Sequence, residues 1–169
     1  LLAWLMQRFK LVLADPKDFA TPGNLLPFAY DWRLSCRYNA RRLKRVVEPA
    51  LERWRALDNA NRDARLIFIC HSMGGLVARW YVEQEGGAAH TRKLITIGTP
   101  HRGAVAALQQ LVNGVEKTVG PLRLELTRFA RSLPSAHQLL PQYACLETGA
   151  GLTPFSAVAL PNLNPALVA

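Results

Sequence analysis

The chain has 169 residues, of which half are apolar and a fifth are charged, so it is long enough to bury the core of one globular domain. No apolar stretch approaches the roughly 18 residues that span a bilayer, and LLAWLMQRF at the start lacks the features of a signal peptide. Three cysteines at unrelated spacings argue against a disulfide framework and a cysteine-based zinc site. Reduced thiols favour a cytosolic setting.

The net charge of +9 is concentrated in part between residues 33 and 45. The basic residues of this segment are Arg33, Arg37, Arg41, Arg42, Lys44 and Arg45. A solvated helix face is the favoured interpretation, and contact with an anionic lipid surface is the alternative. Nucleic acid is not expected as a partner, because the chain has no interleaved aromatic motif, zinc-finger spacing or helix-turn-helix pattern.

The first third of the chain is predicted to form a helix, a loop, a strand and a second helix. Apolar residues recur at helical spacing over residues 1–12, and LPFAYDW, residues 26–32, has the pattern of a strand. An amphipathic helix is expected over about residues 35–57, with Pro49 as a kink or break inside it. Its inward-facing residues are expected to be Tyr38, Val46, Val47, Leu51 and Trp54.

Two later apolar runs, residues 65–70 and 93–98, are typical of strands buried in a parallel sheet. GGLVARWYVEQ between them is predicted to be a helix. This alternation predicts an α/β fold with a parallel sheet and helices on both of its faces, over residues 1–103. After this point, prolines break the chain into helical or irregular segments, and residues 104–169 are interpreted as a cap-like insertion.

Ser72 lies between the strand of residues 65–70 and the following helix, where functional groups collect in parallel sheets. A sharp turn there exposes the side chain at its tip and needs small neighbours, here Cys70 and Gly74. The Met73 N–H at the start of the helix is the natural first oxyanion donor. A helix-capping serine is the alternative, but the whole run ICHSMGGLVARW favours a nucleophile elbow.

Four segments, PFAYDWR, CHSMGGLVARWYVE, LITIGTPHRGA and LPSAHQLLPQY, follow one another over about residues 23–143. In this order they resemble the lecithin:cholesterol acyltransferase-like family of α/β-hydrolase lipases and acyltransferases. The second segment is similar to the family's elbow, in which His71, Gly74 and Gly75 surround the nucleophile. The others resemble its Y-D-W-R segment, its G-T-P-x-x-G segment and a stretch of its cap.

The resemblance implies that Ser72 attacks the carbonyl of a lipid or other acyl ester to give an acyl-enzyme, without a cofactor or metal. A histidine oriented by an acidic residue would act as the base, and water or an alcohol would take the acyl group. Asp31 and Trp32 would shape the floor of the site, although an ion pair between Asp31 and an arginine is equally consistent. His101 is expected to have a positioning or structural role.

The family's triad order is Ser, Asp, His, but no aspartate follows Asp63 in this sequence. His137 in the cap-like segment is interpreted as a surface or cap residue and His90 as a surface loop residue, so neither is expected to be the base. The predicted strands are also fewer than those of an α/β-hydrolase. We therefore expect a partial α/β-hydrolase fold, incomplete at both ends. The alternative is a catalytically inactive remnant or interaction module that retains the elbow.

Overall fold

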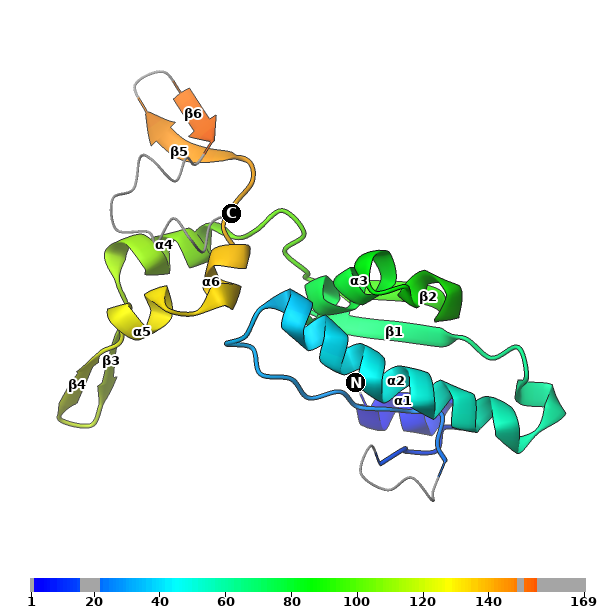
Figure 1. The fold of residues 1–169 in the computed structure, drawn as a ribbon. Coiled ribbons are helices and arrows are strands. Elements are labelled where there is room, and N and C mark those ends of the chain that lie inside the picture. The colour runs from blue at the N-terminus through cyan, green and yellow to red at the C-terminus, as the bar shows by residue number, and fades with distance from the viewer. Residues whose placement is uncertain (1, 16–21, 149–150, 155–169) are drawn as a thin grey trace. The chain divides into compact units, whose positions relative to one another are not determined.

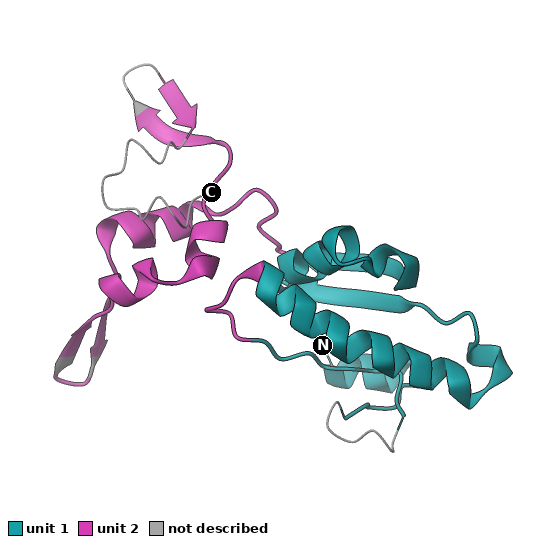
Figure 2. Cartoon of the chain, viewed as in Figure 1, with its two compact units in different colours: residues 1–30, 37–97 teal, residues 31–36, 98–169 magenta. Residues whose placement is uncertain are grey.

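The computed structural model describes residues 2–15, 22–148 and 151–154, and the chain divides into two compact units (Figures 1 and 2). The first unit comprises residues 1–30 and 37–97, and the second comprises residues 31–36 and 98–169. The division therefore follows Ile97, earlier than the boundary expected after residue 103, and the short segment 31–36 joins the second unit. No helix among the described residues is long and apolar enough to cross a membrane.

The first unit contains a parallel sheet of two strands, β1 (Leu66–His71) and β2 (Thr91–Ile97). The strands are connected through α3 (Gly74–Gln84) and the short 3-10 helix η2 (Gly87–His90), and they lie where the apolar runs predict strands (Figure 1). A parallel pair with a helical connection makes this unit α/β, in agreement with the predicted class. The ladder is regular except for a bulge between Leu66 and Ile67, opposite Arg92.

The two faces of this sheet have different surroundings. Every second residue of β1, beginning with Leu66, is half-buried and lies on one face of the sheet. On this face Phe68 packs edge-to-face against Tyr81 of α3, with ring centroids 5.7 Å apart. The other face carries four isoleucines that remain 39–53% exposed: Ile67, Ile69, Ile95 and Ile97. Helices on both faces were expected, but within the first unit the isoleucine face stays open to solvent.

The helix α2 (Cys36–Leu57) buries one stripe at three- and four-residue spacing, made of small and aliphatic residues and one polar residue, Asn39. These buried residues are Cys36, Asn39, Ala40, Leu43, Val47 and Leu51. The expected split at Pro49 does not occur, because the helix continues as one element of 22 residues. Proline removes a single hydrogen bond, and buried Val47 and Leu51 hold the helix on either side of it. Tyr38, expected to face inward, is 47% exposed.

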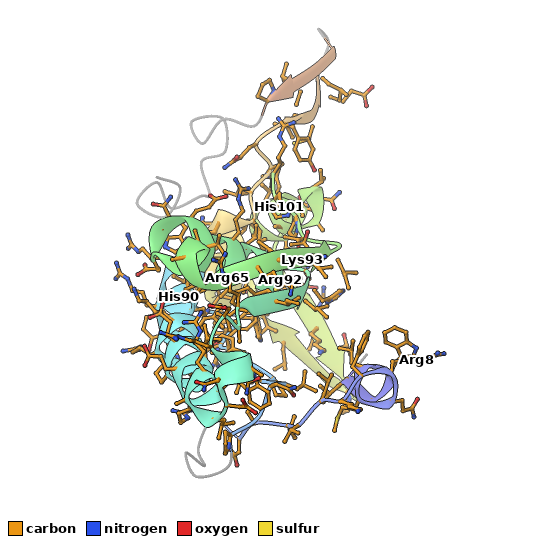
Figure 3. All side chains as sticks on the ribbon, turned by 90° about the vertical axis from the view of Figure 1, so that its right-hand side faces the viewer. Arg8, Arg65, His90, Arg92, Lys93 and His101 are labelled. Carbon is orange, nitrogen blue, oxygen red and sulfur yellow. The ribbon has the colours of Figure 1, made fainter. Side chains whose placement is uncertain are left out.

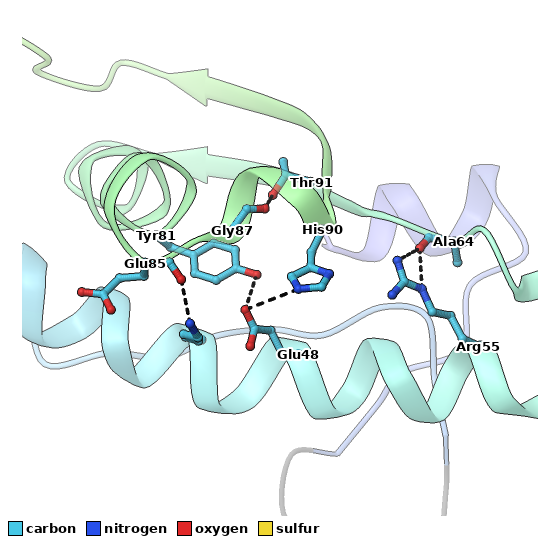
Figure 4. Close-up of polar contacts among 9 residues, drawn as sticks. Glu48, Arg55, Ala64, Tyr81, Glu85, Gly87, His90 and Thr91 are labelled. Atoms are coloured by element: carbon cyan, nitrogen blue, oxygen red, sulfur yellow. Dashed lines mark hydrogen bonds and ion pairs between the residues drawn. The ribbon is translucent and has the colours of Figure 1, made fainter.

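Polar contacts connect α2 to the elements beside it (Figure 4). The Tyr81 hydroxyl of α3 donates to Glu48 Oε1 at 3.2 Å, and Lys44 Nζ donates to the Glu85 carbonyl at 2.7 Å. At the far end, the Arg55 guanidinium donates to the Ala64 carbonyl at 2.9 and 2.6 Å. The last contact spans the turn that contains the 3-10 helix η1 (Asn59–Asn61), which leads into β1.

The beginning of the chain differs most from the prediction. The helix α1 (Leu2–Arg8) forms, but none of its residues is buried. Residues 26–32 form no strand: the parallel bridge from Leu13 to Leu25 just precedes them, and they lie extended outside the β1–β2 ladder. The Asp31 carboxylate also accepts a hydrogen bond from the Arg33 N–H at 3.0 Å, which turns the backbone where the strand would continue.

The second unit combines short helices with two antiparallel hairpins. Its elements are α4 (Val105–Asn113), β3 (Glu116–Val119), β4 (Leu122–Glu125), α5 (Thr127–Arg131), α6 (Pro134–Gln138), β5 (Ala144–Thr148) and β6 (Gly151–Pro154). Leu108, Leu111 and Leu140 form its buried cluster. Short helical segments were expected in this part of the chain, whereas the hairpins were not predicted.

Candidate active site

The turn between β1 and α3 places Ser72 in a backbone conformation that side chains rarely adopt. Its φ is +52°, and among the residues that the structure describes it is the one non-glycine residue with a positive φ. This conformation costs on the order of 1–2 kcal/mol for a residue with a Cβ, so neighbouring contacts must hold it. A strained turn from strand to helix presents the side chain at its tip, and Ser72 is exposed there.

Hydrogen bonds from two elements hold this turn. The Ser72 N–H donates to the carbonyl of Ile97, the last residue of β2, at 2.9 Å. On the other side, the Gly75 N–H donates to the Ser72 carbonyl at 3.1 Å, and the Leu76 N–H donates to the Met73 carbonyl at 3.0 Å. The strained residue is thus fixed between the neighbouring strand and the first turn of α3.

The Met73 N–H lies beside Ser72 at the amino end of α3. It donates no hydrogen bond to any residue in the described part of the chain, and α3 begins without a side-chain cap at Met73. The unpaired N–H groups at a helix start carry a partial positive charge. A donor in this field, next to the Ser72 hydroxyl, is suited to stabilise an oxyanion.

The other residues that were predicted to form an elbow lie around this turn in different ways. His71 ends β1 on the exposed face, opposite Ile97 of β2, and Gly75 is buried in the first turn of α3. A Cβ on Gly74 would lie 3.6 Å from the Tyr30 hydroxyl, an ordinary contact, so the described atoms leave room for a methyl group. Burial raises the pKa of the Cys70 thiol, which keeps it protonated near neutral pH.

Tyr30 is a neighbour of the elbow that the sequence analysis did not single out. Its ring stacks on Phe28 with centroids 6.2 Å apart, and its hydroxyl approaches Gly74. The signal that could have found it is its position in FAYDW, directly before Asp31. The segment of residues 26–30 therefore reaches the elbow by side-chain packing, although it is not a strand.

Asp31, Trp32 and Arg33 belong to the second unit. The Asp31 carboxylate accepts two hydrogen bonds from the Arg33 guanidinium, both 2.8 Å long, and this interaction raises the pKa of Arg33. An ion pair between Asp31 and an arginine, one of the two roles considered for Asp31, is thus formed. Trp32 is 58% exposed.

His101 is exposed on a loop of the second unit that also contains Gly103. Gly103 has a φ of +84°, and a Cβ there would overlap the backbone carbonyl of Leu140. The loop is fixed to the later segment by hydrogen bonds from Ala104 N–H to Leu139 O and from Gln142 N–H to Arg102 O, each 2.8 Å long. The G-T-P-x-x-G-like and cap-like segments therefore pack together.

The segment 31–36 is bound to the same part of the second unit. The Cys36 N–H donates to Gln138 Oε1 of α6 at 2.7 Å, a contact of 102 positions in sequence separation. Sequence patterns gave no signal for Gln138, because a single long-range amide contact has no periodicity. Residues 31–33 and 98–104, the later parts of the first and third recognised segments, thus belong to the same unit as the fourth segment.

The remaining histidines are engaged elsewhere. His137 is only 4% exposed, so it is not a surface residue; its Nε2 lies 2.9 Å from the Arg131 carbonyl. Its Nδ1 is buried and makes no hydrogen bond to a described residue. His90 lies on η2 and is half-buried, 3.9 Å from Glu48 Oε1.

The structure thus places the candidate residues in two groups. His71, Ser72, Met73, Gly74 and Gly75 share the first unit, whereas Asp31, Trp32 and His101 belong to the second. An open cavity of about 430 Å³ lies at the opposite end of β1 from Ser72, where Arg65 and Arg92 are found (Figure 3). The described residues include no group of three or more His, Cys, Asp or Glu that could hold a metal ion.

Comparison with known proteins identifies the family. The family model of lecithin:cholesterol acyltransferase matches residues 20–155, which include all four recognised segments. No curated protein and no solved structure matches the chain. Because the match extends over most of the sequence, the chain belongs to the lecithin:cholesterol acyltransferase family.

Proposed function

We propose that Ser72 is the nucleophile of an acyl-transfer reaction on a lipid ester. Membership of the lecithin:cholesterol acyltransferase family indicates a lipid acyltransferase or esterase type of activity. The observation that supports the role of Ser72 is its φ of +52° at the turn between β1 and α3. A structural helix cap has no need of this conformation, because capping residues normally have extended backbone.

In the proposed reaction the Ser72 hydroxyl oxygen attacks the ester carbonyl and its proton passes to a base. The carbonyl oxygen gains the negative charge and accepts a hydrogen bond from the Met73 N–H. Collapse of the tetrahedral intermediate breaks the bond to the alcohol, which leaves with a proton, and forms the acyl-enzyme. Water or a second alcohol then attacks the acyl carbon and restores the Ser72 hydroxyl.

The base and its orienting carboxylate are not assigned within these 169 residues. No aspartate follows Ser72 in the sequence, and the Nε2 of His137 is already paired with a backbone carbonyl. The part of the machinery that this chain supplies is therefore the nucleophile and the first oxyanion donor.

Labelling of the intact protein with a fluorophosphonate tests the proposal directly. We expect the probe to bind covalently at Ser72, identified by mass spectrometry of the labelled peptide, and to leave Ser72→Ala unlabelled. Ester turnover is expected to fall by about 10⁴-fold or more in the same variant, the scale of nucleophile loss in serine hydrolases. Ser132→Ala removes an exposed serine of the second unit and serves as the matched control. A folded protein that reacts equally with and without Ser72 would refute the role.

Turnover measured with water alone and with an added alcohol distinguishes hydrolysis from acyl transfer. A protein that hydrolyses the ester at the same rate with and without an added long-chain alcohol is an esterase. One that forms a new ester with that alcohol is a transferase, since an acceptor pocket must exclude water from the acyl carbon.

A non-catalytic interaction module is the alternative function. The sequence pattern behind it is that no aspartate follows Ser72 within these 169 residues. Any ester turnover by the isolated 169-residue chain that disappears in Ser72→Ala would exclude this alternative.

A further inference from the structure

The exposed face of α2 carries charge of one sign over its first half. Arg37, Arg41 and Arg45 repeat at four-residue spacing, so they align along the helix with a rise of about 6 Å from one to the next. All three are exposed, and the first acidic residue of the helix is Glu48. We call Arg37, Arg41 and Arg45 the basic stripe.

The basic stripe is unfavourable for the stability of the helix itself. The amino end of a helix is the positive end of its dipole, so cations are disfavoured there, yet α2 has no acidic residue in its first turn. Like charges four residues apart also repel each other. Packing does not dictate the residue type at exposed positions, so an unfavourable choice repeated there indicates a functional surface.

Intramolecular pairs neutralise this charge only in part. Arg41 Nε lies 3.1 Å from Glu85 Oε1, but the Arg41 side chain remains 62% exposed. Neither Arg37 nor Arg45 forms an ion pair with a residue that the structure describes. Glu48 is directed toward Tyr81 and His90, as Figure 4 shows. The stripe is therefore available to an external anion.

We infer that the basic stripe is the contact surface of this protein for an anionic lipid–water interface, an inference that rests on the proposed action on lipid esters. A row of guanidinium groups along one side of a helix suits an array of phosphates and carboxylates, because each group presents several donors to such oxygens. Tyr38 lies beside the row and is 47% exposed; tyrosine is enriched at membrane interfaces for its apolar ring and polar tip. The contact holds the enzyme at the surface where its substrate is found.

Vesicle flotation of the intact protein tests the inference. Phosphatidylcholine vesicles with and without about one-third phosphatidylserine are used near 0.15 M salt, where the Debye length is about 8 Å. Arg37→Gln/Arg45→Gln is expected to weaken binding to the anionic vesicles by about 30-fold, because each basic residue at such a surface contributes about 5-fold. This variant keeps the pair between Arg41 and Glu85 intact, and circular dichroism verifies its fold.

Arg92→Gln/Lys93→Gln is the matched control, since it removes the same charge from two exposed residues of β2 (Figure 3). Arg92 and Lys93 form no ion pair with a described residue, and in this they match Arg37 and Arg45. We expect vesicle binding by the control to weaken less than about 3-fold, because its two charges lie on β2 and not on the exposed face of α2 that makes the proposed contact. Equal losses of binding to anionic vesicles in the two double variants, or no loss of binding in either, would overturn the inference.

A soluble short-chain ester distinguishes failure of the inference from failure of the proposed function. Its Ser72-dependent hydrolysis should be the same in the wild type and in both double variants, while turnover of esters in anionic vesicles falls in Arg37→Gln/Arg45→Gln. If the soluble ester is never hydrolysed but vesicle binding depends on the stripe, the proposed catalysis fails and the lipid contact stands. Stripe-dependent binding to duplex RNA without binding to vesicles would contradict the lipid contact.

Discussion

At Ser72, the backbone conformation suited to the proposed chemistry is one that costs stability. The residue has a φ of +52°, which glycine adopts without penalty and residues with a Cβ do not. The hydrogen bond from its N–H to Ile97 and the turn into α3 hold the strained geometry. We expect the protein to become more stable when this backbone strain is removed by substitution.

The comparison of Ser72→Gly with Ser72→Ala measures this strain. Both variants lose the hydroxyl, but only glycine relieves the left-handed backbone, so Ser72→Gly should be more stable than Ser72→Ala by about 1 kcal/mol. Urea unfolding followed by circular dichroism gives the two free energies of unfolding. Equal values would mean that the positive φ carries no strain in solution.

Among the elements, the sequence predicted the helices and strands that have a local pattern of apolar residues. The helix α2, the strands β1 and β2 and the helix between them lie where local patterns predict them. The buried side of α2 was predicted only in part: Val47 and Leu51 are buried, whereas Tyr38 is exposed. Residues 26–32 have the composition of a strand but find no ladder partner, and pairing is a long-range property that composition does not contain. The hairpin of β3 and β4 did have a local signal: Gly120, with a φ of +59°, followed by Pro121.

The contact between α2 and α3 leads to a pH dependence. Burial, followed by the charge and hydrogen bond of Glu48, raises the pKa of Tyr81 in the folded protein. Above pH about 10 the unfolded chain loses the tyrosine proton while the folded protein keeps it, so the free energy of unfolding falls as pH rises. Tyr81→Phe has no group to titrate, and its stability should decline less steeply in urea unfolding between pH about 9 and about 11. Parallel declines in the two proteins would contradict the assignment.

At the scale of the whole molecule, the candidate site was predicted only in its local part. The turn between β1 and α3 consists of consecutive residues, so the sequence predicted that Ser72 and Met73 lie at the start of a helix. The catalytic roles of these two residues are still predictions. Other features of the site depend on contacts between distant parts of the chain. These features are the placement of Asp31 and His101 in the second unit, the burial of His137, and the hydrogen bond from Cys36 to Gln138. Such contacts have no signature in one sequence.

The exposed isoleucine face of the sheet predicts the solution behaviour of the 169-residue chain. Contiguous exposed apolar surface promotes association, and Ile69 and Ile95 are directly paired across the two strands. Ile69→Thr/Ile95→Thr should reduce dye binding and concentration-dependent association, with a change in stability of about 0.5 kcal/mol or less. Leu94→Thr on the half-buried face should instead destabilise the protein by about 1–2 kcal/mol. Unchanged sedimentation in the double variant would show that this face is not the source of association.

The elbow also has a consequence for hydrogen exchange. Two adjacent amides differ in their protection: Ser72 N–H is bound to the carbonyl of Ile97, while Met73 N–H has no acceptor among the described residues. The Ser72 amide should exchange with deuterium slowly and the Met73 amide quickly, although they are neighbours in the chain. A covalent phosphonate adduct on Ser72 would place an oxygen at the free amide and slow its exchange. Isotope exchange at one backbone position would then report the occupancy of the proposed oxyanion site without any measurement of turnover.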